Sequence, residues 1–174
     1  MAEIRKLGRK TDHRLAMLKN LTTSVIWHGQ IETTEPKAKE VKSIVDSLIS
    51  LAIKEKDNYE MVEATVSKAK LDEKGNKVTE TVTSKNGKEY SRVVRETITK
   101  TVQKDNPSRL AARRKLIANL NKVKDENGEY VDLPGKMLGE IAEKYADRKG
   151  GYTRIIKLGQ RRGDAAEAVI LQLV

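Results

Sequence analysis

The spacing of apolar residues changes character twice along the chain, near residue 57 and near residue 107. Outside these points apolar residues recur every three to four positions, which is typical of amphipathic helices. Between them Val, Thr and Ile alternate with polar residues, which is typical of strands. A chain of 174 residues fits one domain plus an insertion. We therefore predict an α+β fold in which residues 57–106 form a β-rich extension inserted into a core of residues 11–56 and 107–174.

Two helices joined by a short strand are predicted before the insertion. Residues 12–27 have helical periodicity, and Gly29 is placed to end that helix. Residues 30–33 are β-prone and confined between Gly29 and Pro36, so we predict a brief strand. The second helix follows Thr34. Its apolar positions keep the 3.6-residue period closely and make it the clearest core element: Ala38, Val41, Ile44, Val45, Leu48, Ile49, Ala52 and Ile53.

Two further helices and a hairpin are predicted after the insertion. The helices cover about residues 108–121 and 135–146, and the polar loop between them contains an Asn-Gly turn. The hairpin pairs residues 152–158 with residues 165–174. The complete prediction is thus four helices, a small sheet and the inserted segment.

The inserted segment contains three runs with strand-like alternation, Met61–Ser67, Val78–Thr83 and Tyr90–Val102. Asn86-Gly87 separates the last two, and Asn-Gly is the strongest short hairpin signal. We predict a three-stranded meander that is only marginally stable alone. Residues 57–106 hold ten basic and nine acidic residues. This near balance favours a solvent-side extension or a contact with a neighbouring protein over a main binding surface for a polyanion.

The positive charge of the chain is concentrated in three blocks. The whole chain has a net charge of +10. Residues 1–20 contribute +4, residues 107–124 contribute +6 and residues 147–163 contribute +5. Such blocks favour nucleic acid as a partner. A membrane is the weaker candidate and we expect none as a partner, because no run approaches the roughly 18 apolar residues of a transmembrane helix. Aromatic residues make up only 3% of the chain, so phosphate and sugar contacts are favoured over base stacking.

No constellation of residues for catalysis is evident in the sequence. The chain has no cysteine, and its two histidines, His13 and His28, have no ligand partners at suitable spacing. Neither a phosphate-binding loop nor a nucleophile motif is present. We therefore expect no enzyme activity, no metal, no cofactor and no small-molecule substrate. With no secretory signal in the sequence, we expect a cytoplasmic protein.

Both ends of the chain resemble the bacterial large-subunit ribosomal protein L17 family. The resemblance rests on RKLGRKTDHRLAMLKNLTTSVIWHG, IETTEPKAKEV and KYADRKGGYTRIIKLGQRRGDAAEAVILQLV, and covers about residues 1–56 and 107–174. It implies four helices packed on a small three-stranded mixed sheet, formed by the brief strand and the C-terminal hairpin. It also implies a structural role in translation, with large-subunit ribosomal RNA and neighbouring ribosomal proteins as partners, near the nascent-chain exit tunnel. The family usually joins the second and third helices directly, so the insertion is a departure.

A basic N-terminal arm, residues 1–10, and the three basic blocks supply the candidate RNA-binding residues. We expect the arm to become ordered only on an anion, because it cannot bury itself. Tyr152 is open to two interpretations, a stacking contact with RNA or a half-buried core residue. The alternative function is a general nucleic-acid-binding or chaperone module. The candidates are Arg5, Lys6, Arg9, Lys10, His13, Arg14, Lys19, Arg109, Arg113, Arg114, Lys115, Arg148, Tyr152, Arg154, Arg161 and Arg162.

Overall fold

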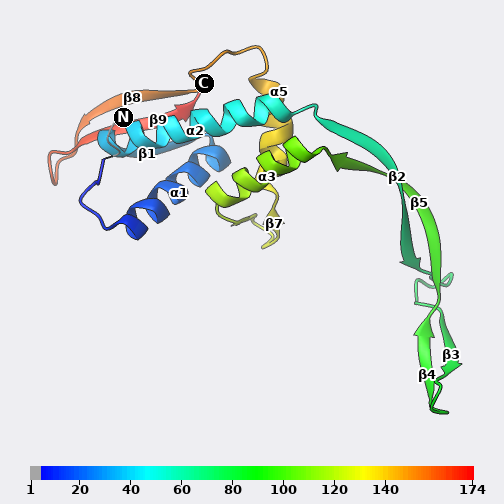
Figure 1. Cartoon of the computed structure of the whole chain (residues 1–174). Coiled ribbons are helices and arrows are strands. Elements are labelled where there is room, and N and C mark those ends of the chain that lie inside the picture. The colour runs from blue at the N-terminus through cyan, green and yellow to red at the C-terminus, as the bar shows by residue number, and fades with distance from the viewer. Residues whose placement is uncertain (1–4) are drawn as a thin grey trace. The chain divides into compact units, whose positions relative to one another are not determined.

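The computed structural model describes residues 5–174 and divides the chain into two compact units. The core unit comprises the described residues up to Asn58 and residues 105–174, and the ribbon unit comprises residues 59–104. The insertion is thus two residues shorter at each end than predicted. Most helices and strands of both units are labelled in Figure 1.

Three long helices form most of the core unit. They are α1 (Thr11–His28), α2 (Glu35–Glu55) and α3 (Pro107–Asn119). Gly29 ends α1 as predicted: its φ of 81° is left-handed, and its N–H donates to the carbonyl of Val25. Proline occupies the first turn of α2 and of α3, where no intrahelical N–H donor is needed. These three of the four predicted helices are present, and α1 and α3 lie within one or two residues of their expected limits.

The sheet of the core unit contains β1 (Gln30–Thr34), β8 (Thr153–Gln160) and β9 (Glu167–Leu173). Their order is β1-β9-β8, and both pairings are antiparallel. The expectation of a mixed sheet is therefore wrong. The central strand β9 follows β8 through a tight hairpin, and β1 runs against its other edge, with Gln30 opposite Gln172. A sheet whose centre is the last strand joins the C-terminal segment to the residues between α1 and α2.

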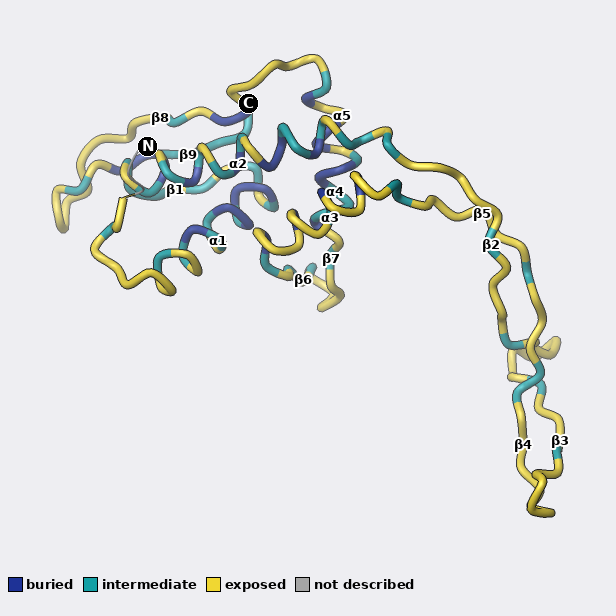
Figure 2. Tube along the Cα trace, in the orientation of Figure 1, coloured by how far each residue is buried: buried dark blue, intermediate teal, exposed yellow. Residues whose placement is uncertain are grey.

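An aliphatic core lies between the helices and the sheet. Because the chain has no Phe, Leu, Ile, Val and Met fill this space. Helix α2 contacts α1, α3 and the sheet, which explains its regular apolar period. The buried stretches of these elements are dark blue in Figure 2. Fully buried side chains from five elements include Val25, Val41, Val45, Ile49, Leu116, Met137, Leu138, Val169 and Leu171.

The last helical segment is continuous but irregular. It consists of α4 (Leu133–Lys136), a π-helical turn (Met137–Ile141) and α5 (Ala142–Lys144). It therefore begins two residues before the predicted position. Asp132 caps it by accepting a hydrogen bond from the Gly135 N–H. The preceding loop contains a small hairpin that was not predicted, β6 (Val123–Lys124) paired with β7 (Tyr130–Val131).

The ribbon unit contains four strands in two separate pairs. They are β2 (Tyr59–Ala69), β3 (Thr79–Thr83), β4 (Glu89–Val93) and β5 (Arg95–Asp105). Strand β2 pairs with β5, and β3 pairs with β4. The predicted three-stranded meander is therefore wrong, since the run Tyr90–Val102 is two strands. The break is at Val94, whose N–H donates to Val78 while its carbonyl accepts from Lys70. Nearly all of this unit is exposed (Figure 2).

Candidate nucleic-acid interface

The N-terminal arm is held against the core unit from Arg5 onward. The Arg5 guanidinium lies 2.6 Å from the Glu40 carboxylate on α2, and Leu7 packs against the core. The expectation that the arm becomes ordered only on an anion stays a prediction, and the first four residues of the arm lie outside the described part. Lys6, Arg9 and Lys10 stay exposed. Anchoring by one arginine thus leaves three cations presented to solvent.

One side of α1 continues the arm. Arg9, His13 and Asn20 line a shallow hollow of about 390 Å³ along this helix. Arg14 and Lys19 are half-buried, and within residues 5–174 neither forms an ion pair. The Nε of Arg14 is buried without a hydrogen-bond partner. This combination suits groups that contact phosphate, because their charge is not already neutralised by the protein.

The basic block of α3 has one buried arginine. The Arg109 side chain has its Nε 3.0 Å from the Asp105 carboxylate and also donates to the carbonyl of Lys56. Only 6% of the residue is exposed. Arg109 therefore stabilises the junction between α2 and α3, and we withdraw it as an RNA-binding candidate.

The other cations of α3 differ in how far they are neutralised. Arg113 pairs with Asp105 and Asp132. Arg114 and Lys115 are exposed and form no ion pair within the described residues. Lys115 also lines a hollow between α3 and α2 together with Lys54. Arg114 and Lys115 are thus the stronger candidates of this block.

The C-terminal hairpin presents part of its charge. Arg154 and Arg162 are exposed, whereas Arg161 pairs with Asp164 at 2.7 Å. The backbone N–H of Ala166 and the Arg161 guanidinium lower the pKa of the Asp164 carboxyl. A salt bridge inside the turn fixes its shape and leaves Arg162 as its unpaired cation. The two arginines are therefore not equivalent, although they are neighbours in sequence.

Tyr152 is a core residue. It is 5% exposed, its ring packs edge-on against Tyr145 at 5.6 Å, and its hydroxyl donates to the carbonyl of Arg148. A ring enclosed in this way has no face for a base, so we withdraw the stacking role. Arg148 itself is exposed, and its Nε donates a hydrogen bond to the carbonyl of Gly150.

The fold brings the basic segments together along two helices. Arg5 of the arm pairs with Glu40, and Lys157 of β8 lies 3.7 Å from Glu35, so arm and hairpin both meet the first part of α2. The end of α3 joins α1 instead, because the Asn121 N–H donates to the Thr23 hydroxyl. These neighbours are far apart in sequence but adjacent in Figure 1. The three blocks thus occupy a single unit.

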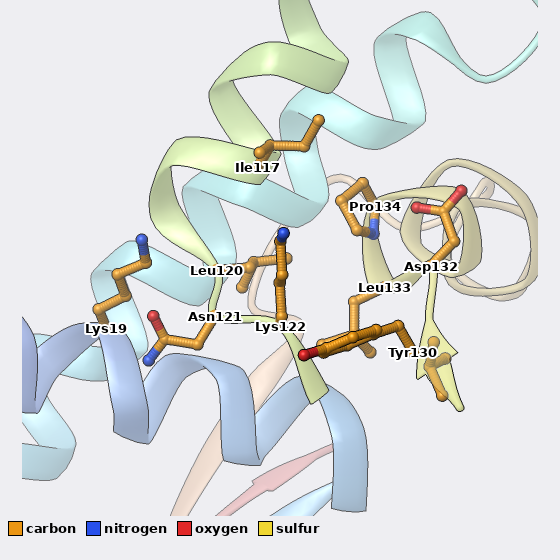
Figure 3. Close-up of a pocket in the computed structure, with 10 residues that line it drawn as sticks. Lys19, Ile117, Leu120, Asn121, Lys122, Tyr130, Asp132, Leu133 and Pro134 are labelled. Atoms are coloured by element: carbon orange, nitrogen blue, oxygen red, sulfur yellow. The ribbon is translucent and has the colours of Figure 1, made fainter. Parts of the chain in front are cut away.

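A group of residues beyond the predicted candidates lies at the end of α3. The Nζ atoms of Lys122 and Lys124 lie over the exposed ring of Tyr130. Figure 3 shows Lys122 and Tyr130 in one hollow with Lys19 of α1. A sequence signal for this group exists. Lys-Val-Lys before an Asn-Gly turn places both lysines on one strand face, and Tyr130 follows the turn.

The described residues contain neither a group of three or more potential metal ligands nor a helix long and apolar enough to cross a membrane.

A sequence profile of ribosomal protein L17 matches residues 17–174. The chain belongs to the ribosomal protein L17 family. It is therefore a ribosomal protein and not an enzyme.

Relatives of known name agree with this family. The chain is 56% identical over 170 residues to large ribosomal subunit protein bL17 of Acetivibrio thermocellus, covering 98% of both chains. It is 46% identical to the protein of that name from Lachnospira eligens over the full length of both. Identity to the Staphylococcus epidermidis protein is 36% over 173 residues, again 98% of both chains. The L17 profile match also spans the ribbon unit.

Proposed function

We propose that this L17 family member is a structural component of the large ribosomal subunit that binds large-subunit ribosomal RNA in the cytoplasm. Its relatives are named as proteins of that subunit. The observation that carries RNA binding is that ten of the candidate cations form no ion pair within residues 5–174. These ten lie on the arm, α1, α3, the loop before β8 and the C-terminal hairpin: Lys6, Arg9, Lys10, Arg14, Lys19, Arg114, Lys115, Arg148, Arg154 and Arg162.

These cations favour contacts with phosphate and sugar. They are exposed or half-buried, they come from separated segments, and none stacks on an aromatic ring of the core. Such contacts fix the position of a protein on folded RNA without reading its bases. His13, on the same side of α1 as Arg9, adds a hydrogen-bonding group to that surface. The resemblance at both termini further supports a position near the nascent-chain exit tunnel.

The ribbon unit is proposed to contact a neighbouring ribosomal protein. Val62, Val66 and Val102 are large apolar residues that this unit leaves exposed. A two-stranded ribbon buries little apolar surface and is marginal alone. Aliphatic side chains gain more from a protein surface than from phosphates, because they offer no charge or hydrogen bond.

Binding of the full-length chain to large-subunit ribosomal RNA and to duplex DNA at physiological salt tests RNA binding. We expect the RNA to be bound more tightly. Equal affinity for the two would support the general nucleic-acid-binding alternative instead. Titrations at several salt concentrations then report how many phosphates the protein neutralises.

A matched pair of double variants identifies the surface. Arg114→Ala with Lys115→Ala should reduce the slope of log affinity against log salt by about 1 for each phosphate that the variant no longer neutralises. Lys85→Ala with Lys88→Ala removes two exposed lysines around the Asn86-Gly87 turn of the ribbon unit. This control should keep the wild-type slope. An unchanged slope in the α3 variant would remove α3 from the interface.

A further inference from the structure

Tyr130 is an aromatic residue that the fold leaves in water. It lies in β7 directly opposite Lys124 of β6, and 68% of it is exposed. The hairpin that carries it has only two paired residues in each strand. An exposed ring adds little to the stability of such a hairpin, because the hydrophobic effect requires removal of apolar surface from water. The ring is therefore available to a ligand.

The hollow in front of this ring has apolar walls. Its volume is about 550 Å³, and Ile117, Leu120, Leu133 and Pro134 line it together with Tyr130. Ile117 is 56% exposed even though it lies on α3 beside the core. The volume falls within the roughly 300–1,000 Å³ of small-molecule sites in proteins. Figure 3 shows Tyr130, Leu133 and Pro134 on one side of the hollow and Lys19, Asn121 and Lys122 on the other.

Lysines surround the ring. The Nζ atoms of Lys124 and Lys122 lie 5.0 and 5.8 Å from the ring centroid of Tyr130. Lys19 of α1 adds a third ammonium group at the opposite wall. Asp132 also borders the hollow, but its carboxylate is paired with Arg113. The remaining positive charge lies on the side of α1 and β6.

The turn that joins β6 to β7 limits how a ligand lies there. Asp125, Glu126 and Glu129 make this turn acidic. Asp125 is occupied, since its carboxylate accepts the backbone N–H groups of Asn127 and Glu129. A phosphate is repelled by this turn and attracted by the lysines. An anionic ligand with a flat apolar part therefore has one orientation, with its charge toward Lys19 and Lys122.

We propose that this hollow binds a single unpaired nucleotide of RNA, with its base stacked on Tyr130 and its flanking phosphates on Lys19 and Lys122. A nucleotide combines the two properties that the site matches, a flat π-face and an adjacent negative charge. The inference rests on the proposed RNA-binding function and specifies one of its contacts. It also adds a stacking contact to an interface that otherwise consists of cations.

Three RNA ligands test the site with the full-length chain: large-subunit ribosomal RNA, a 12-nucleotide single strand and a 12-base-pair duplex. Base stacking on an aromatic ring predicts that Tyr130→Ala weakens binding of the first two by about 5- to 150-fold. The duplex should be bound as by the wild type, because its bases cannot leave the stack. Tyr130→Phe keeps the ring and should retain wild-type affinity for all three ligands.

Tyr90→Ala is the matched control, since Tyr90 is also half exposed but lies in β4 of the ribbon unit. It should leave all three affinities unchanged. The proposal is overturned if Tyr130→Ala binds the single strand with wild-type affinity. It is also overturned if the substitution weakens binding of the duplex as much as binding of the single strand. A wild-type chain that binds duplex DNA as tightly as ribosomal RNA contradicts the proposed function. If the wild type prefers ribosomal RNA but Tyr130→Ala binds all ligands with wild-type affinity, only the nucleotide site is contradicted.

Discussion

The core unit and the ribbon unit are made of the same residue types but are stabilised differently. In the core unit, helices and a three-stranded sheet enclose Leu, Ile and Val side chains that are fully buried. In the ribbon unit, the β2–β5 pair leaves Val and Met side chains exposed. The comparison shows that alternation of apolar residues predicts strands, but does not say whether anything covers them.

The boundary between the two units lies inside a strand. Asp105 is the last residue of β5, yet it belongs to the core unit through its ion pairs with Arg109 and Arg113. Next to it, Asn106 and Asn58 are joined by a side-chain amide hydrogen bond and by a longer backbone one of 3.3 Å. Hydrogen bonds between Asn58 and Asn106 thus join the two chain segments of the core unit next to the insertion.

Replacing Asp105 should give the largest effect. Because the Arg109 side chain is only 8% exposed, Asp105→Ala leaves a buried guanidinium without its carboxylate. Breaking a buried pair in this way costs about 3–5 kcal/mol in the free energy of unfolding. Glu96→Ala is the control, since Glu96 is an exposed residue of the same strand, and it should stay within about 0.5 kcal/mol of wild type. Urea titration measures the free energy of unfolding of both variants. Equal values would show that Asp105 does not contribute more to the core unit than an exposed ribbon residue does.

Removing the ribbon unit should have a much smaller effect on the core. A variant that joins Asn58 to Asp105 through two glycines keeps the asparagine pair and both ion pairs of Asp105. We expect it to unfold cooperatively near the wild-type Tm and to bind ribosomal RNA with wild-type affinity. Deletion of the whole segment 57–106 also removes Asp105 and should lower the Tm. Weaker RNA binding by the shorter deletion would show that the ribbon is part of the RNA interface.

The smallest effect concerns a half-buried carboxylate, that of Glu35, which joins β8 to α2. A hydrogen bond from Lys39 and the charge of Lys157 lower the pKa of Glu35 from 4.5. A lowered pKa means that its stabilisation is present above about pH 4.5 and is lost as the pH falls through the folded-state pKa. Glu35→Gln should therefore lower the Tm slightly at pH 7, and this difference should shrink below pH 4.5. Glu89→Gln in the ribbon unit should leave the Tm unchanged at both pH values.

Part of the candidate site was predictable from the sequence, and part was not. Charge blocks correctly marked segments that present exposed cations such as Lys10 and Arg114. They could not separate Arg114 from Arg109, because that difference depends on Asp105 and on the carbonyl of Lys56. Nor could they separate Arg162 from Arg161, which Asp164 neutralises. The low aromatic content favoured phosphate contacts over base stacking and so did not indicate Tyr130.

Local patterns along the sequence by themselves determined the helices of the core, the C-terminal hairpin and the concentration of charge, because periodicity and turn residues act over a few positions. Tertiary structure alone decided which cations are neutralised, that β9 is the central strand and that β2 returns to β5. It also placed Tyr130 and Lys19 of α1 on opposite walls of one hollow. These outcomes depend on residues far apart in the chain, whose meeting is a property of packing and not of any local pattern.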